Sequence, residues 1–327
     1  KKHYHGSSLR AKSILSIIED SSQNVWAASF LYGLFKYNPG SDSFEHIDLS
    51  HKGIEVKDIN VLYEGPDKKI WIGTNQDGLV IFDPQTKQAD FFQYNLMKSR
   101  GQILSNSIQA ILIDKNSTAW IGTSDAGISC YNLKTKKFTD YNTSNGKLPN
   151  NSIYSIKQDS FGNIWIGTKE GLISISPKGE TKVYTEKNGL PNSTIYSIEI
   201  DHNNNLWIST CNGLSKYDTT AKLFTNFFTT DGIASNEFRR GASFEAKDGK
   251  MFFGGINGVT TFVPFNSENT NDLLNLVLTD LYIYNDPVKI SDDGILTKAL
   301  NACDKIYLRY DVKNFSIGYS CIEYNSP

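Results

Sequence analysis

Residues 153–172 read I-Y-S-I-K-Q-D-S-F-G-N-I-W-I-G-T-K-E-G-L, a pattern that indicates two consecutive β-strands joined by a turn. A first apolar segment leads to Asp159, a polar turn follows, and a second segment begins at Trp165. Gly and Asn in that turn tolerate positive φ, which favours a tight connection between two strands. The apolar residues of W-I-G-T are consecutive rather than alternating, as expected for a strand that is buried on both faces.

The same pattern recurs along most of the chain, with a large aromatic residue at intervals of about 45 residues. After each W-I-G-T-like strand comes a turn that ends in Gly, then a third strand and an outer strand such as F-T-D-Y (residues 138–141). Four strands per repeat and no helical pattern predict an all-β fold, a β-propeller of four-stranded blades. The recurring aromatic residues are Trp26, Trp71, Trp120, Trp165, Trp207 and Phe252.

Six repeats are visible, and the two ends of the series are irregular. The sixth repeat (residues 238–264) lacks an obvious fourth strand, and residues 1–5 resemble an orphan fourth strand. That orphan either completes the last blade and closes the ring, or ends a seventh blade. We expect the six repeats to be part of a seven-bladed ring, within a fragment of a longer protein.

The repeat pattern stops near residue 265, which predicts a domain boundary. We assign residues 1–265 to the propeller and residues 266–272 to a polar linker rich in Asn, Ser and Thr. Residues 273–327 are interpreted as the N-terminal part of an Ig-like β-sandwich. Its predicted strands cover residues 276–284, 305–310 and 315–324.

The net charge and the cysteine positions say what kind of protein to expect. The formal net charge of -2, with both signs interspersed, gives no support for nucleic-acid binding. Cys130 and Cys211 fall inside repeats, where we expect small buried side chains. Cys303 and Cys321 lie close in sequence, and their spacing leaves a disulfide bond open.

No motif for catalysis is visible, and we expect no catalytic residue, no cofactor and no metal. P-loop, G-x-S-x-G and H-E-x-x-H patterns are all missing from the sequence. The five histidines are scattered and read as solvated side chains. The D-S-F-G-N-I-W run (residues 159–165) resembles the Asp-box turn of sialidases, but a structural turn is the favoured interpretation.

Candidate ligand-binding residues lie on one face of the predicted propeller. Arg239 and Arg240 follow a blade-crossing loop and either bind a ligand or form ion pairs, for example with Glu237. The crossing loops and the turns between second and third strands meet at the same end of every blade. The remaining candidate ligand-binding residues are Asn106, Asn150, Asn192, Asn236 and Glu237 in or beside the loops, and Asp77, Asp125, Glu170 and Asn212 in the turns. Each alone is explained by turn formation, whereas the face as a whole suits ligand binding.

These repeats resemble a known family. The W-I-G-T strand, the G-L turn and L-P-N-N-S-I-Y-S-I (residues 148–156) are similar to the two-component-regulator propeller repeat. S-N-E-F (residues 235–238) and G-G-I-N-G (residues 254–258) resemble that family's final blade. L-V-L-T-D-L-Y-I-Y (residues 276–284) resembles the start of the Ig-like domain named for its three-tyrosine motif.

The resemblance implies the periplasmic sensor region of a Bacteroides-type hybrid two-component system, anchored in the inner membrane. Such a region would recognise an oligosaccharide from polysaccharide breakdown and signal to a histidine kinase that regulates glycan-utilisation genes. It implies an oligosaccharide ligand, a neighbouring propeller of the parent chain and a homodimer as partners. The fragment itself would be no enzyme, whereas its parent would be a sensor histidine kinase.

Two alternatives stay open at this point. Fold analogy allows a propeller lyase or lactonase with a metal in the central channel. The second alternative is a purely structural dimerisation propeller that needs no ligand.

Overall fold

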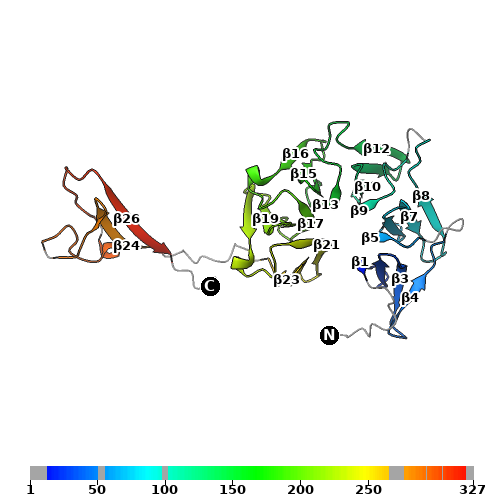
Figure 1. Ribbon diagram of the computed structural model, residues 1–327, viewed down its shortest axis with the longest axis horizontal. Coiled ribbons are helices and arrows are strands. Elements are labelled where there is room, and N and C mark those ends of the chain that lie inside the picture. The colour runs from blue at the N-terminus through cyan, green and yellow to red at the C-terminus, as the bar shows by residue number, and fades with distance from the viewer. Residues whose placement is uncertain are drawn as a thin grey trace. The chain divides into compact units, whose positions relative to one another are not determined.

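The computed structural model describes residues 13–50, 56–97, 102–264, 276–291, 293–303 and 305–321. The chain divides into two compact units, residues 1–264 and 265–327. In the first unit, six antiparallel sheets are arranged around a common axis, with the first strand of each sheet nearest that axis (Figure 1). The predicted all-β propeller of four-stranded blades is therefore confirmed.

Each of the first five blades is a meander of four strands in sequence order. Blade one comprises β1 (Ile14–Glu19), β2 (Val25–Ser29), β3 (Gly33–Asn38) and β4 (Ser43–Ile47). Blade two comprises β5 (Ile59–Glu64), β6 (Ile70–Thr74), β7 (Leu79–Phe82) and β8 (Ala89–Phe92). Blade three comprises β9 (Ile108–Ile113), β10 (Thr118–Thr123), β11 (Ile128–Asn132) and β12 (Lys137–Tyr141).

The second half of the ring repeats this plan. Blade four comprises β13 (Ile153–Gln158), β14 (Ile164–Thr168), β15 (Gly171–Ile175) and β16 (Thr181–Tyr184). Blade five comprises β17 (Ile195–Ile200), β18 (Leu206–Thr210), β19 (Leu214–Asp218) and β20 (Leu223–Phe227). In blade six the described residues form three strands, β21 (Phe238–Glu245), β22 (Met251–Gly255) and β23 (Gly258–Phe262). Single 3-10 turns, η1 (Glu186–Asn188) and η2 (Thr229–Asp231), lie in the crossing loops of the last two junctions.

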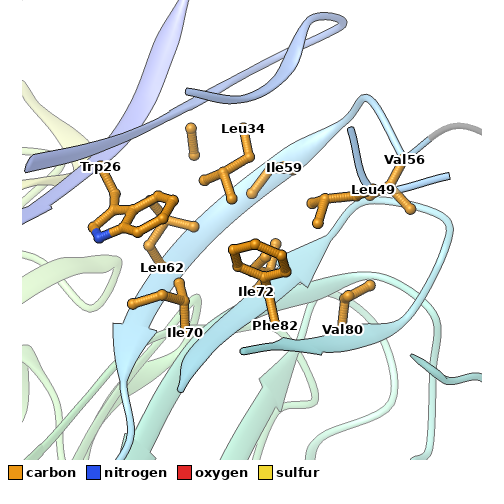
Figure 2. Close-up of a cluster of buried hydrophobic side chains, with 11 residues drawn as sticks. Trp26, Leu34, Leu49, Val56, Ile59, Leu62, Ile70, Ile72, Val80 and Phe82 are labelled. Atoms are coloured by element: carbon orange, nitrogen blue, oxygen red, sulfur yellow. The ribbon is translucent and has the colours of Figure 1, made fainter. Parts of the chain in front are cut away.

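The W-I-G-T strands are the buried layer of each blade, as their consecutive apolar residues predict. Every residue of β14 is buried, and the same holds for β6 and β18. Each Trp packs onto the next blade along the chain: Trp26 of β2 lies against Leu62 and Ile70 of blade two (Figure 2). Burying one Trp removes about 150–250 Å² from water. At about 25 cal/mol per Å² this contributes at most ~4–6 kcal/mol per blade.

An aspartate carboxylate holds four of the five Trp side chains and the turn before each of them. In blade four the Asp159 carboxylate accepts hydrogen bonds from Trp165 Nε1 at 2.9 Å and from the Asn163 backbone N–H at 2.8 Å. The D-S-F-G-N-I-W run is thus a structural turn, as the sequence interpretation favoured. Blade two carries Gly65 at the equivalent place, and buried Trp71 Nε1 has no hydrogen-bond partner among the described residues. The other Asp–Trp pairs are Asp20–Trp26, Asp114–Trp120 and Asp201–Trp207.

The Gly of the W-I-G-T strand lets neighbouring blades approach closely. A Cβ placed on Gly167 would lie 2.7 Å from Ile195 Cγ2 of blade five, and one on Gly122 would lie 2.6 Å from Ile153 Cγ2 of blade four. Real Cβ atoms do not come this near to another side chain, so blade spacing depends on the missing side chain.

The two end blades differ from the internal ones in what covers them. Ile17 of β1 is 63% exposed, and Phe244 of β21 is 61% exposed. Glu19 Oε1 of blade one and Lys247 Nζ of blade six come within 3.5 Å. The predicted orphan strand, residues 1–5, lies outside the described residues, so the prediction of a seven-bladed ring stays a prediction.

The second unit contains a small antiparallel sheet of strand order β25-β24-β26. β24 (Leu276–Ile283) pairs with β25 (Asp286–Pro287) and with β26 (Phe315–Cys321), and η4 (Leu300–Ala302) packs nearby. Residues 305–310 form no strand, so that prediction was wrong: Tyr307 and Tyr310 are 80% and 100% exposed and have no strand to pair with. The linker at residues 266–272 lies outside the described residues, and the Ig-like assignment stays a prediction.

Three cysteine side chains can be placed. Cys130 is buried in β11 as expected, and burial raises the pKa of its thiol strongly. The expectation for Cys211 was wrong, because this residue lies in the exposed turn that follows the buried strand β18. Cys303 is a free thiol that points to the carbonyl oxygen of Ala299 at 3.5 Å.

Candidate ligand site

Two tyrosines on neighbouring innermost strands form the aromatic part of the candidate ligand site. Tyr154 is the second residue of β13, and Tyr196 is the second residue of β17. Their ring centroids are 6.1 Å apart, and both side chains are half-buried. The two rings are tilted by 41° to one another, and together they offer aromatic surface to the apolar groups of a ligand.

Arg240 of blade six extends this aromatic surface. Pairing between β21 and β22 is irregular between Phe238 and Ser243, so Arg239 and Arg240 lie in a bulge that redirects their side chains. The Arg240 guanidinium carbon lies 4.8 Å from the Tyr154 ring centroid. At this distance the guanidinium makes a cation–π contact with the ring, and its N–H donors can bind hydroxyl or carboxylate oxygens of a ligand.

Arg239 behaves differently from its neighbour. Its Nη1 lies 3.8 Å from Glu237 Oε1, and both side chains are substantially exposed. Of the two interpretations of the arginine pair, Arg239 therefore takes the ion pair with Glu237, and Arg240 takes an aromatic partner. An exposed pair of this kind contributes little to stability, so ligand exchange costs little.

Burial is the main influence on the Tyr196 hydroxyl. It raises the pKa of Tyr196 above its ordinary value, and Cys211 and the negative charge of Glu237 raise that pKa further. A tyrosine hydroxyl is protonated at neutral pH even without these effects, so it can both donate and accept a hydrogen bond.

The crossing-loop asparagines that the sequence singled out shape backbone turns. The side-chain oxygen of Asn150 accepts from Ser152 N–H at 2.7 Å, and that of Asn236 accepts from Thr229 N–H at 2.8 Å. Turn formation thus accounts for their side-chain oxygens. The same role falls to Asn106, through Tyr94 N–H, and to Asn192, through Thr194 N–H.

The structure brings these loops and the strand-connecting turns to the same end of each blade. Gly213 N–H donates to the Asn236 carbonyl at 2.7 Å, which ties the turn of blade five to the next crossing loop. The side chains of Asp125, Glu170 and Asn212 are exposed there. Burial and the neighbouring Asp58 raise the pKa of half-buried Asp77. Ligand binding by these four turn residues stays a prediction.

Sequence reasoning missed Tyr154, Tyr196 and Cys211. The signal that could have found the tyrosines is variation within the repeat. The position that holds Tyr154 and Tyr196 in blades four and five holds Asn60 in blade two and Gln109 in blade three. A position whose residue type changes while its neighbours repeat is a candidate for function, although Tyr196 also packs against the core cluster of blades five and six.

Within the residues that the structure describes, no group of three or more His, Cys, Asp and Glu side chains is placed to hold a metal ion. No helix in the part of the chain that the structure describes is long and apolar enough to span a membrane.

Comparison with known sequences identifies the repeat. The family described as two component regulator propeller matches residues 102–125, 147–170 and 189–212, three repeats that each run from a crossing loop into a W-I-G-T-type strand. The resemblance to this family's repeat that was drawn from the sequence is confirmed for these three segments of the propeller.

The chain is also similar to one curated protein and to two solved extracellular domains. Histidine kinase P4 of Formosa agariphila is 29% identical over 320 residues, covering 94% of this chain and 23% of that protein. The extracellular domain of a hybrid two-component system from B. thetaiotaomicron is 29% identical, covers 96% of this chain and 42% of that one, and superposes with a TM-score of 0.74. A second extracellular domain from B. thetaiotaomicron, described as part of a one component system, is 18% identical over 94% of this chain and 48% of that one, with a TM-score of 0.58, and shows the fold alone.

The chain is therefore similar to part of the extracellular domain of a hybrid two-component system. It spans about a quarter of the curated kinase and less than half of the first structural relative.

Proposed function

We propose that this chain is the ligand-sensing part of a periplasmic ectodomain, and that its parent is a hybrid sensor histidine kinase. In this proposal the ligand is an oligosaccharide released from a polysaccharide, and the parent regulates genes for glycan utilisation. The neighbouring propeller and a second copy of the parent are the proposed partners, through which ligand binding reaches the kinase.

The observation that carries the ligand class is the Tyr154–Tyr196–Arg240 cluster. A sugar ring has an apolar face of C–H groups and a rim of hydroxyls. The tyrosine rings suit the apolar face, and the in-plane donors of Arg240 suit the rim. Exposed carboxylates and amides on the surrounding turns offer further partners for hydroxyl groups.

A glycan array probed with this chain tests the proposal. We expect one related group of oligosaccharides to bind, and Tyr154→Ala to lower that signal about tenfold or more, because the stacking surface is lost. Tyr94→Ala is the matched control, since Tyr94 is an exposed tyrosine that follows β8 of blade two. Equal signals from Tyr154→Ala and wild type, or no binding across plant, algal and host glycans, would contradict the proposal.

A further inference from the structure

Arg240 carries a positive charge that no carboxylate in the described part of the chain neutralises. Its guanidinium carbon lies 4.8 Å from the Tyr154 ring centroid, a cation–π contact. Its neighbour Arg239 instead has Nη1 3.8 Å from Glu237 Oε1. A guanidinium has five N–H donors, and those of Arg240 have no oxygen acceptor among the described residues. They are therefore available to a ligand.

The net charge beside the Tyr154–Tyr196–Arg240 cluster is positive. Arg239 and Arg240 contribute two positive charges and Glu237 contributes one negative charge, which sums to +1. Because Glu237 is the ion-pair partner of Arg239, the charge in excess is that of Arg240. An anionic group of a ligand is attracted to that charge.

Among the described first strands, charge at this level of the ring comes from blade six. Arg239 and Arg240 lie in the bulge of β21 that follows Phe238. The second residue of the first strand is uncharged in each of blades one to five, where it is Leu15, Asn60, Gln109, Tyr154 and Tyr196 in turn. An acidic group that binds at this level is therefore drawn to one place, beside Tyr154.

Stacking of a ligand on Tyr154 also affects the charge of Arg240. A sugar ring that covers the tyrosine removes water from the guanidinium next to it. A neutral ligand replaces that water with hydroxyl oxygens alone, whereas a carboxylate supplies the opposite charge and accepts two parallel N–H bonds. Because a desolvated charge without a counter-ion is costly, the proposed stacking favours an acidic group next to the stacked ring.

The same end of the propeller limits the number of acidic groups that a ligand can carry. The turns between second and third strands hold Asp77 in blade two, Asp125 in blade three and Glu170 in blade four. A polyanionic chain that extends across these turns meets like charge, which lowers its affinity. One acidic group on an otherwise neutral chain avoids this repulsion.

From these observations we infer that the ligand is an oligosaccharide with a single uronic acid, whose carboxylate pairs with Arg240. The inference rests on the proposed function and deepens it by naming the charge of the ligand and the residue that recognises this charge. The two can fail separately. Binding of neutral oligosaccharides alone overturns the inference and leaves the proposed function standing, whereas no oligosaccharide binding at all overturns both.

Titration calorimetry of this chain with matched ligands tests the inference. The probes are short oligosaccharides that each contain one glucuronic, galacturonic, mannuronic or guluronic acid, together with the methyl ester and the neutral counterpart of each. The ester keeps the sugar ring and removes the charge. We expect at least one acid to bind, and its ester to bind about tenfold or more weakly, because a charge-assisted pair is lost. Equal affinity of acid and ester, or binding of neutral probes only, overturns the inference.

Two variants locate the charge that produces this difference. Arg240→Gln removes the guanidinium charge and should reduce the preference for the acid over its ester to less than about twofold. Lys182→Gln removes one positive charge from the exposed outer strand β16 and is the matched control, which should keep the preference. A preference that survives Arg240→Gln, or that both folded variants lose equally, also overturns the inference. The comparison of acid and ester on the wild-type chain needs neither variant and stands even if one fails to fold.

Discussion

Blades one and four share a skeleton, meaning the four-stranded sheet with its Asp–Trp hydrogen bond, but they differ in how their first strands are covered. In both, an aspartate accepts the indole N–H of the blade's Trp: Asp20 from Trp26 at 2.8 Å, and Asp159 from Trp165 at 2.9 Å. Yet Ile17 in the first strand of blade one is 63% exposed, whereas the equivalent Ile156 in blade four is 5% exposed. The same residue type at the same position is core or surface according to whether a neighbouring blade covers it.

The two blades also differ at two positions of their first strands. Where blade four has Tyr154 and Lys157, blade one has Leu15 and Ile18. Neither position is needed to form a blade, because both blades form the same sheet. In the proposed function, the ligand-contacting residues therefore occupy positions that vary between repeats, and they lie in blades four to six.

The largest expected effect comes from removing the shared skeleton. Asp159→Ala leaves Trp165 Nε1 and both the backbone and side-chain N–H donors of Asn163 without their acceptor. We expect a loss of about 3–5 kcal/mol in the free energy of unfolding, measured by urea denaturation, because several donors become unsatisfied at once. Asp20→Ala should cost a similar amount. A loss below about 1 kcal/mol in both variants would mean that the Asp–Trp pair does not hold the blade.

Truncating the covered isoleucine should have the next largest effect. Ile156→Ala opens a cavity between blades and should cost about 2–4 kcal/mol, whereas exposed Ile17→Ala should cost less than about 0.5 kcal/mol. The same urea measurement compares them. Equal losses would show that the exposed face of blade one is covered in solution, for example by a further blade.

Ligand affinity should distinguish the two blades at the second position of the first strand. In titration calorimetry with an oligosaccharide selected on the array, Tyr154→Ala should weaken binding about tenfold or more. Leu15→Ala, at the equivalent position of blade one, should leave the dissociation constant unchanged. Weaker binding in the Leu15 variant would move the site toward blade one.

Acid sensitivity should be the smallest of these effects. Burial raises the pKa of Asp20, but hydrogen bonds from Trp26, Asn24 and Ser22 together outweigh it, so the folded-state pKa lies below the ordinary value. A lowered pKa contributes stability above the unfolded-state value of about 3.9, and that stability is lost as pH falls through the folded value. Urea denaturation between pH 7 and 3 should show a smaller loss for Asp20→Asn than for wild type. Identical pH profiles would contradict this assignment.

The skeleton could be predicted from the sequence because it repeats. Trp165, its W-I-G-T strand and the preceding Asp recur often enough to reveal strand number, burial and blade order. Arg240 was found because a paired arginine after a crossing loop stands out. Its partner Tyr154 was not predicted as a site residue. A tyrosine inside an apolar strand is normally assigned to the core, and the sequence does not show which strands lie side by side. Cys211 and residues 305–310 were misjudged because burial there depends on turns and partner strands that local pattern does not contain.

The most direct test of the central claim is a crystal structure of this chain with the oligosaccharide that binds best on the array. The account predicts a sugar ring stacked on Tyr154 and Tyr196, with at least one hydroxyl or carboxylate oxygen within hydrogen-bond distance of Arg240. A ligand that is well ordered elsewhere on the propeller, with the tyrosine surface empty, would contradict it.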